Sequence, residues 1–288
     1  MSARAKLRRL VGLSKGIARG AVLPAAGRQP IAPAPGGTLA DTPGAPGNQA
    51  GAFRVVRHEL PVAGLRAELR LLHITDVHVR GLGPWLDGLC AFLAEAPAAD
   101  LVLLTGDLVT HGWSAEAWGR FAAACPRGAL GTFAIRGNWE HWCGAGGPAW
   151  SERLAAAGIR LLHNERVEAA GLQLIGLDDA LAGTADWSLL ERADGATPTV
   201  VLSHCPDTFP RIARPQIPLV LSGHSHGGQV RLPGLGALWL PKGTGRWVAG
   251  WYREGSSQLY VSPGLGWSIA PLRAGCPPQI DLITLRPA

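Results

Sequence analysis

The chain has 288 residues, of which 47% are hydrophobic and 17% are charged, so it is long enough for one large or two small folded domains. This composition argues against a disordered chain and against a fibrous repeat. The net charge of +6 would suggest a polyanionic partner, but seven of the 27 basic residues lie within residues 1–28, which contain no acid. The remaining 20 basic residues face 21 acidic ones, so we expect no nucleic-acid partner.

The five cysteines are widely spaced and include no CxxC pair. An odd number of cysteines without that spacing argues against a disulfide scaffold and against a thiolate zinc site. No stretch of the sequence reaches the roughly 18 uninterrupted apolar residues that a membrane-spanning helix needs.

Residues 1–23 predict a basic amphipathic or targeting segment. On a helical wheel, most apolar residues of positions 4–19 lie on one side and five basic residues on the other, as in helices that bind anionic membrane surfaces. Arg8-Arg9 resembles a twin-arginine export signal, although Lys15 and Arg19 interrupt its apolar part. We expect a bacterial peripheral membrane protein, and a soluble cytoplasmic or exported protein with a plain or processed tail is the alternative.

Residues 24–52 are rich in Pro, Gly and Ala and predict a linker, and residues 53–288 predict one domain. The predicted strands are Phe53–Leu60, Leu69–Ile74, Leu101–Thr105, Gly131–Ile135, Leu172–Leu177, Thr199–Ser203, Leu219–Ser222, Ala237–Leu240, Gln258–Val261 and Ile280–Thr284. The predicted helices are Trp85–Ala96, Ala115–Ala124, Ala149–Ala157 and Thr208–Ala213. Helices that alternate with strands predict a layered α/β domain.

Five of the predicted strands end in residues that commonly bind metals. These residues are Asp76, His78, Asp107, Asn138, His204, His224 and His226. Positions two apart in an extended chain point to the same side, so the pairs 76/78 and 224/226 can each face one ion. A single histidine is most often a packing residue, but five such segments together predict a metal site at the carboxyl ends of the strands.

The order Asp76-x-His78, Gly106-Asp107, Gly137-Asn138, His204 and Gly223-His224-x-His226 resembles the full signature of the calcineurin-like metallophosphoesterases. The resemblance covers about residues 69–230. It implies an α/β/β/α fold, a layered β-sandwich flanked by helices with a dinuclear metal site at strand ends, and a metal-bridging hydroxide as nucleophile.

The same resemblance implies that Asp107 bridges two divalent ions. Asp76, His78 and His226 would hold one ion, and Asn138, His204 and His224 the other. Imidazole, carboxylate and amide ligands suit Mn, Fe or Zn and do not separate these three metals.

Residues 176–179 and 227–266 resemble the YkuE-type branch, which includes pyrophosphatases that act on the lipid A precursor UDP-2,3-diacylglucosamine. The resemblance implies a hydrolase of phosphoester or pyrophosphate bonds acting on an envelope lipid intermediate. Hydrolysis of soluble nucleotides or phosphodiesters is the alternative. A non-catalytic scaffold is disfavoured because every ligand position is filled. The expected partners are a phosphorylated or nucleotide-linked small molecule or lipid and, through residues 4–19, an anionic membrane.

Trp139 departs from the family pattern, which has a histidine there to protonate the leaving group. An indole cannot donate a proton at neutral pH. Either His141 takes this role, or the leaving group is a weak base that departs unaided, as in a pyrophosphate. His141 is therefore a predicted catalytic residue. Asn138, a predicted metal ligand, is the other.

Overall fold

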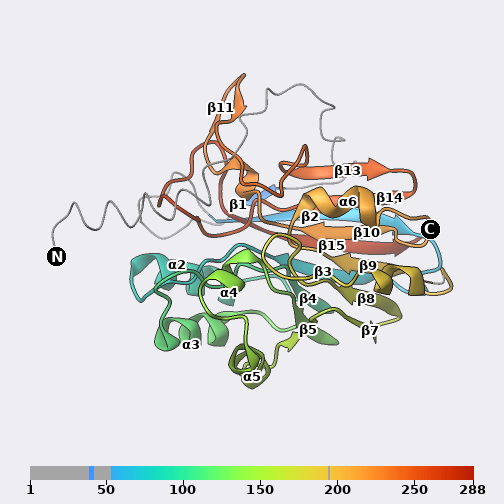
Figure 1. Cartoon of the computed structure of the whole chain (residues 1–288), viewed down its shortest axis with the longest axis horizontal. Coiled ribbons are helices and arrows are strands. Elements are labelled where there is room, and N and C mark those ends of the chain that lie inside the picture. Colours follow the sequence, from blue (N-terminus) through green and yellow to red (C-terminus); the bar gives the residue numbers. More distant parts are fainter. Residues whose placement is uncertain (1–38, 42–52, 194) are drawn as a thin grey trace.

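Two sheets and their flanking helices make up the part of the chain that the computed structural model describes, residues 39–41, 53–193 and 195–288 (Figure 1). The predicted segment 1–23 lies outside these residues. Of the predicted linker 24–52, only Leu39–Asp41 is described, and it forms strand β1 at the edge of the first sheet.

The first sheet has seven strands in the order β1-β2-β15-β3-β4-β5-β6. Beyond β1 they are β2 (Arg54–Val62), β3 (Leu69–Ile74), β4 (Leu101–Leu104), β5 (Gly131–Ala134), β6 (Arg160–Leu161) and β15 (Gln279–Pro287). Strands β3 to β6 run parallel to one another. Strand β15 lies between β2 and β3, parallel to the first and antiparallel to the second. The last strand in the chain therefore joins the first two long ones.

The second sheet has six strands in the order β13-β14-β10-β9-β8-β7. They are β7 (Glu165–Ala169), β8 (Leu172–Gly176), β9 (Thr199–Leu202), β10 (Leu219–Ser222), β13 (Gly250–Glu254) and β14 (Ser257–Val261). The four strands β8, β9, β10 and β14 are parallel. A separate small hairpin joins β11 (Arg231–Leu232) and β12 (Gly236–Ala237).

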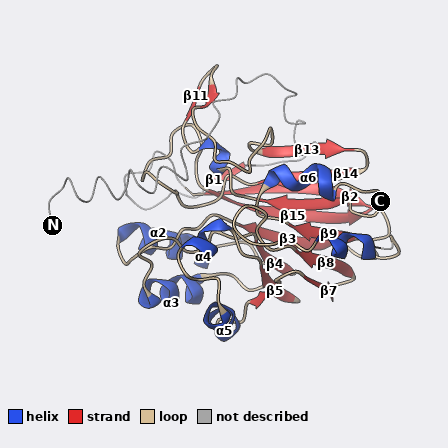
Figure 2. Ribbon diagram, viewed as in Figure 1, coloured by secondary structure: helices blue, strands red, loops and turns tan. Residues whose placement is uncertain are grey.

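Helices cover the outer faces of both sheets (Figure 2). Helices α2 (Pro84–Ala94), α3 (Ala115–Ala124) and α5 (Pro148–Ala156) pack on the first sheet. The 3₁₀ helix η1 (Trp187–Arg192) and helix α6 (Phe209–Ile212) pack on the second. Three further short helices are α4 (Asn138–Trp142), η2 (Pro206–Thr208) and η3 (His226–Gly228).

Successive side chains of the buried strands point to opposite faces of each sheet and so contribute to two separate cores. In β4, Leu101 and Leu103 belong to the core between the two sheets, whereas Val102 and Leu104 belong to the core under the helices. Both faces of this strand are buried, as expected for a parallel strand with layers on either side. The second sheet divides in the same way, so the layers are helix, sheet, sheet and helix. The predicted α/β/β/α architecture is confirmed.

Most predicted elements are present within two or three residues of their expected ends, and β3, β10 and α3 have the predicted bounds. The predicted strand Ala237–Leu240 is wrong, because only Ala237 is in a strand and Leu238 beside it is exposed. Strand β7 was not predicted. It is an edge strand with one buried residue, Val167, so it lacks a strong apolar pattern.

A buried polar network joins the two sheets around Asp281 of β15. Its Oδ1 accepts hydrogen bonds from the Tyr260 hydroxyl at 2.6 Å and from Gln279 Nε2 at 2.6 Å, and lies 3.2 Å from His58 Nε2. Burial opposes its ionisation, but the hydrogen bond from His58 holds the pKa of Asp281 below its usual value. The network therefore carries a buried negative charge, which is costly to leave without partners.

Candidate metal centre

Two groups of buried side chains meet at the carboxyl ends of β3, β4, β9 and β10, and they share Asp107. One group is Asp76, His78, Asp107 and His226, and the other is Asp107, His204 and His224. Within each group, one potential ligand atom per residue lies within 4.8 Å of all the others. The cluster could hold two divalent ions side by side.

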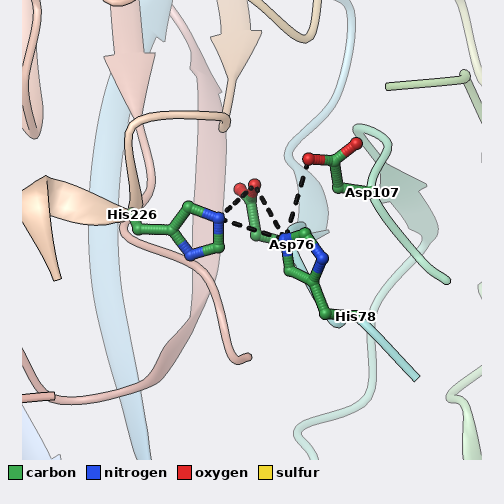
Figure 3. A group of neighbouring side chains, drawn as sticks. All are labelled: Asp76, His78, Asp107 and His226. Carbon is green, nitrogen blue, oxygen red and sulfur yellow. Dashed lines mark hydrogen bonds and ion pairs between the residues drawn. The ribbon is translucent and has the colours of Figure 1, made fainter. Parts of the chain in front are cut away.

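In the first group the ligand atoms point toward one another (Figure 3). Nε2 of His226 lies 3.3 Å from Asp76 Oδ1 and 3.1 Å from Nε2 of His78. The same His78 nitrogen lies 3.7 Å from Asp107 Oδ2. Two imidazoles and two carboxylates aimed at one point form a donor set that suits a borderline divalent cation.

Backbone carbonyls orient the two histidines of the second group. His204 Nδ1 lies 2.7 Å from the Thr105 carbonyl oxygen, and His224 Nε2 lies 2.7 Å from that of Lys242. A carbonyl oxygen only accepts hydrogen bonds, so these nitrogens carry the protons. The other ring nitrogens, His204 Nε2, which lies 3.1 Å from Asp107 Oδ2, and His224 Nδ1, are therefore the ones that can offer a lone pair to a cation.

Asn138 provides a separate indication that a cation fits here. Its Oδ1 is buried and has no hydrogen-bond partner among the described residues, and the same is true of His204 Nε2. A buried amide oxygen without a partner costs on the order of 1–3 kcal/mol. A cation bound by both atoms would remove this cost, so the residues present fit a divalent metal.

The backbone at this site is strained. Asp76, His78, Asp107, His224 and His226 all have left-handed φ values, between 51° and 67°. They make up five of the eight non-glycine residues with positive φ in the described part of the chain. Each such residue costs about 1 kcal/mol or more, and such strain concentrates at functional sites.

The two residues of each pair, 76/78 and 224/226, were expected to face the same side because they are two apart in an extended strand. The left-handed conformation shows that this geometric reason is wrong. Strands β3 and β10 end before these pairs, so the ligand-type residues do not alternate along an extended strand. Each pair instead lies in a tight loop whose turns bring both side chains to the same side.

Glycines allow these loops to approach one another. Gly106 has a φ of 93°, and a Cβ there would lie 2.7 Å from the Gly137 Cα. A Cβ on Gly223 would collide with the side chains of Thr75 and Asp76. The close packing of the loops therefore requires glycine before Asp107 and before His224.

Glu140 is a buried member of this site that the sequence reasoning missed. Its Oε1 accepts from the backbone N–H of Leu108 at 2.6 Å and of Val109 at 3.3 Å. Its Oε2 accepts from Asp107 at 2.9 Å and Gly137 at 2.7 Å. Glu140 thus ties the Asp107 loop to the start of α4, where Asn138 lies. The available signal was its position at N3 after Gly137, where acids cap helices.

Burial and mutual charge perturb the titration of the ligand-type residues. Burial raises the pKa of Asp76 to about 7, and Asp107 adds to the rise. Burial lowers the pKa of His224 to about 4 and those of His78 and His226 well below the usual value. Burial opposes the protonation of His204, but Asp107 raises its pKa well above the usual value. Three imidazoles are therefore neutral at pH 7, as metal binding requires, and a bound cation would displace the proton of the fourth.

Arg273 lies fully buried behind the site, and no motif indicated it. Its Nε donates to the Gly266 carbonyl at 2.7 Å and its Nη2 to that of Pro263 at 2.8 Å. Nη2 also lies 3.4 Å from Nδ1 of His226. Since the Gly266 N–H donates to the Asp76 carbonyl at 2.6 Å, Arg273 braces the turn that supports two ligand-type residues.

Trp139 forms part of an aromatic wall beside the site. Its ring lies edge-on to His78 at 5.6 Å between centroids, to His111 at 5.4 Å and to Trp142 at 5.7 Å. Its backbone N–H donates to Asp107 Oδ1 at 2.8 Å. The wall leaves Trp142 largely exposed, so an apolar surface borders the cluster.

His141 turns toward a different partner. Its Nε2 lies 2.9 Å from Asp178 Oδ1, and the other oxygen of Asp178 accepts from the Thr184 N–H at 2.9 Å. The hydrogen bond to Asp178 raises the pKa of His141. Asp178 thus orients this imidazole and favours its protonated form.

Comparison with known proteins supports a metal centre in this domain. The calcineurin-like phosphoesterase family matches residues 69–228. The chain is 29% identical over 198 residues to the uncharacterized metallophosphoesterase YkuE of Bacillus subtilis, which covers 65% of this chain and 68% of that protein. It is 30% identical over 250 residues to the phosphodiesterase YaeI of Escherichia coli, which covers 82% and 89%. No helix in the described part of the chain is long and apolar enough to cross a bilayer.

Proposed function

This chain belongs to the calcineurin-like phosphoesterase family, a family of metal-dependent hydrolases of phosphoester bonds, and from that premise we propose its ligands, its proton donor and its substrate. The single observation that carries the proposal is the sharing of Asp107 by two buried groups of ligand-type side chains. A shared carboxylate would hold two ions close enough to act on one phosphoryl group.

We assign Asp76, His78 and His226 to one ion and Asn138, His204 and His224 to the other, with Asp107 between them. The orphaned Asn138 Oδ1 and the tautomers of His204 and His224 support this division. Two divalent ions, when bound, would stabilise charge on the phosphoryl oxygens and lower the pKa of the attacking water. The choice among Mn, Fe and Zn is tested by metal analysis of the purified protein.

The leaving oxygen takes its proton from His141 in this proposal. As water forms the new P–O bond, the bond to the leaving oxygen breaks and that oxygen needs a proton if it is strongly basic. The Asp178 hydrogen bond and the raised pKa of His141 support its role as the donor, and Trp139 cannot fill it.

A series of phosphodiesters with leaving groups of increasing pKa tests this role. We expect His141→Gln to lower kcat by about 10² to 10⁴ for alkyl leaving groups and far less for p-nitrophenyl. An equal loss for every leaving group would show that His141 is structural. Full activity of the variant on all of them would support the other interpretation, in which the substrate is a pyrophosphate that needs no acid.

We propose an envelope lipid intermediate, with UDP-2,3-diacylglucosamine as the reference compound, as the substrate. The resemblance of residues 176–179 and 227–266 to the YkuE-type branch and the aromatic wall of Trp139 and Trp142 support a ligand with a lipid part. The similarity to the phosphodiesterase YaeI of E. coli favours a second candidate, a soluble phosphodiester.

One substrate panel separates the two candidates. It contains UDP-2,3-diacylglucosamine, UDP-N-acetylglucosamine and bis-p-nitrophenyl phosphate, each assayed with Mn²⁺, Fe²⁺ and Zn²⁺. A kcat/KM at least about tenfold higher for the acylated compound than for its unacylated analogue supports the lipid substrate. Equal values for the two would refute it, and activity in Asp107→Ala would refute the metal-dependent hydrolysis itself.

We also propose that residues 4–19 bind anionic membranes as an amphipathic helix, so that the enzyme is a peripheral membrane protein. The pattern of basic and apolar residues in the sequence supports this. Replacement of Arg8, Arg9, Lys15 and Arg19 by glutamine should weaken binding of the full chain to anionic vesicles. Unchanged binding would leave the segment as a targeting signal or a tail.

A further inference from the structure

Exposed apolar side chains are concentrated in one region of the described chain. Six of its nine exposed large hydrophobic residues lie in two short segments, residues 232–239 and 269–272, which we call the apolar patch. Its most exposed members are Leu235 at 67%, Ile269 at 59% and Leu238 at 50%. Such a concentration on a soluble surface marks an interaction site.

The two segments lie side by side. Val230 and Ala274 form a parallel bridge, and the Arg231 N–H donates to the Ala274 carbonyl at 2.8 Å. Gln229 Nε2 also donates to the Ala270 carbonyl at 2.8 Å. The hairpin of β11 and β12 projects from the sheets at the top of Figure 1. The patch therefore combines the projecting hairpin with a segment that is hydrogen-bonded to the hairpin base.

The base of this projection is connected to the metal centre. The hairpin begins directly after η3, which starts at His226, and Lys242 beyond β12 accepts from His224 Nε2. On the second segment, Arg80 donates to the carbonyls of Trp267 at 3.1 Å and Ser268 at 2.5 Å. Whatever binds the patch is thus held next to the loops that carry three of the ligand-type histidines.

Basic residues predominate around the patch, and of these Arg246 is paired with Glu254 at 4.0 Å. Residues 229–253 contain Arg231, Lys242, Arg246 and Arg253 and no acidic residue, and residues 267–280 contain no acid either. Exposed leucines, the exposed ring of Trp239, the half-buried ring of Trp267 and basic side chains together match the interface of an anionic bilayer, where apolar groups enter the acyl boundary and tryptophan lies at the headgroups.

We propose that the apolar patch docks on an anionic lipid bilayer and holds the metal centre at the membrane surface. This surface is distinct from residues 4–19, and the proposal does not depend on which phosphoester is hydrolysed. Removal of leucine side chains from the patch should weaken lipid binding even when no substrate is present.

The test compares vesicle binding of full-length variants without substrate. The patch variant is Leu235→Gln with Leu238→Gln, and the control is Leu130→Gln, which changes a leucine of similar exposure, 54%, that precedes β5. Vesicles contain phosphatidylcholine with or without one quarter phosphatidylglycerol. For the anionic vesicles we expect at least about a tenfold lower partition coefficient for the patch variant and no change for the control.

The N-terminal segment must not mask the result. The same comparison is therefore repeated in full-length chains whose Arg8, Arg9, Lys15 and Arg19 are replaced by glutamine. A patch variant that binds as well as its parent in this background would overturn the proposal, as would a parent that does not bind at all.

A second readout separates lipid from protein as the occupant. Sedimentation without lipid should give the same oligomeric state for the patch variant and its parent, and hydrolysis of bis-p-nitrophenyl phosphate should be unchanged. Dissociation of an oligomer by the variant would identify the patch as a contact between copies of this chain and overturn membrane docking. Loss of hydrolysis in the parent would instead contradict the proposed function and leave the lipid result valid.

Discussion

Replacement of Glu140 by glutamine tests whether a buried carboxylate organises the metal centre. Each Glu140 oxygen accepts two backbone N–H groups, so the new amide NH₂ must face two donors in either orientation. At about 1.5 kcal/mol for each charge-assisted bond, the two lost bonds amount to about 3 kcal/mol. The removed charge no longer has to be desolvated, which offsets part of this loss.

The stability assay is guanidinium unfolding at pH 8. Burial, with a contribution from Asp107, raises the pKa of Glu140 to about 7, so the wild-type carboxylate is ionised at this pH. We expect Glu140→Gln to lower the free energy of unfolding by about 1 to 3 kcal/mol after this offset, and metal affinity by about 10- to 100-fold, because Asp107 and Asn138 lose their common support. Glu152→Gln, on the exposed face of α5, is the matched control.

A variant within about 0.5 kcal/mol of wild type, with unchanged metal affinity, would refute this reasoning. That outcome would mean that the loop after β4 holds its left-handed conformation, and α4 its position, without the carboxylate.

Three further predictions concern separate parts of the molecule. Asp107→Ala should lower the metal content from two ions to one or none per chain by elemental analysis, and two ions in the variant would contradict the shared ligand. Asp281→Ala should lower the free energy of unfolding by about 3 to 5 kcal/mol, because the Tyr260 hydroxyl loses its acceptor between the sheets; a loss under 1 kcal/mol would contradict this. Asp178→Asn should flatten the pH dependence of the free energy of unfolding at both ends. The pKa of His141 is raised, so its contribution to stability is complete below pH 6.5 and is lost as the pH rises through the raised pKa. The pKa of Asp178 is lowered, so its contribution is complete above pH 3.8 and is lost at lower pH. Parallel stability curves for variant and wild type would contradict this last prediction.

The sequence predicts the layers and the candidate site well, because both depend on local patterns. Short apolar runs such as Leu101–Leu104 are typical of buried strands, and a polar residue directly beyond such a run is expected at the strand end. What the sequence does not reveal depends on contacts between distant segments. Arg273 has no local pattern that indicates its burial, and the role of Glu140 requires the Asp107 loop to lie against α4.

The exposed leucines of the β11–β12 hairpin are another feature that the sequence pattern does not predict. Residues 237–240 have a strand-like apolar pattern, and a pattern alone cannot distinguish burial in a core from exposure at the end of a hairpin. The left-handed backbone of Asp76 and His78 is likewise invisible in a sequence that reads as the continuation of a strand.

The position of β15 has a consequence for biosynthesis. A ribosome makes residues 279–287 after every residue of the metal centre, yet among the described strands β15 is the only neighbour that β2 and β3 share. Until β15 emerges from the ribosome, β3 is unpaired along one edge, and the loop with Asp76 follows a strand of an incomplete sheet. We therefore expect metal to bind only after β15 has been synthesised and the first sheet is complete. A nascent chain stalled before residue 279 should bind metal poorly.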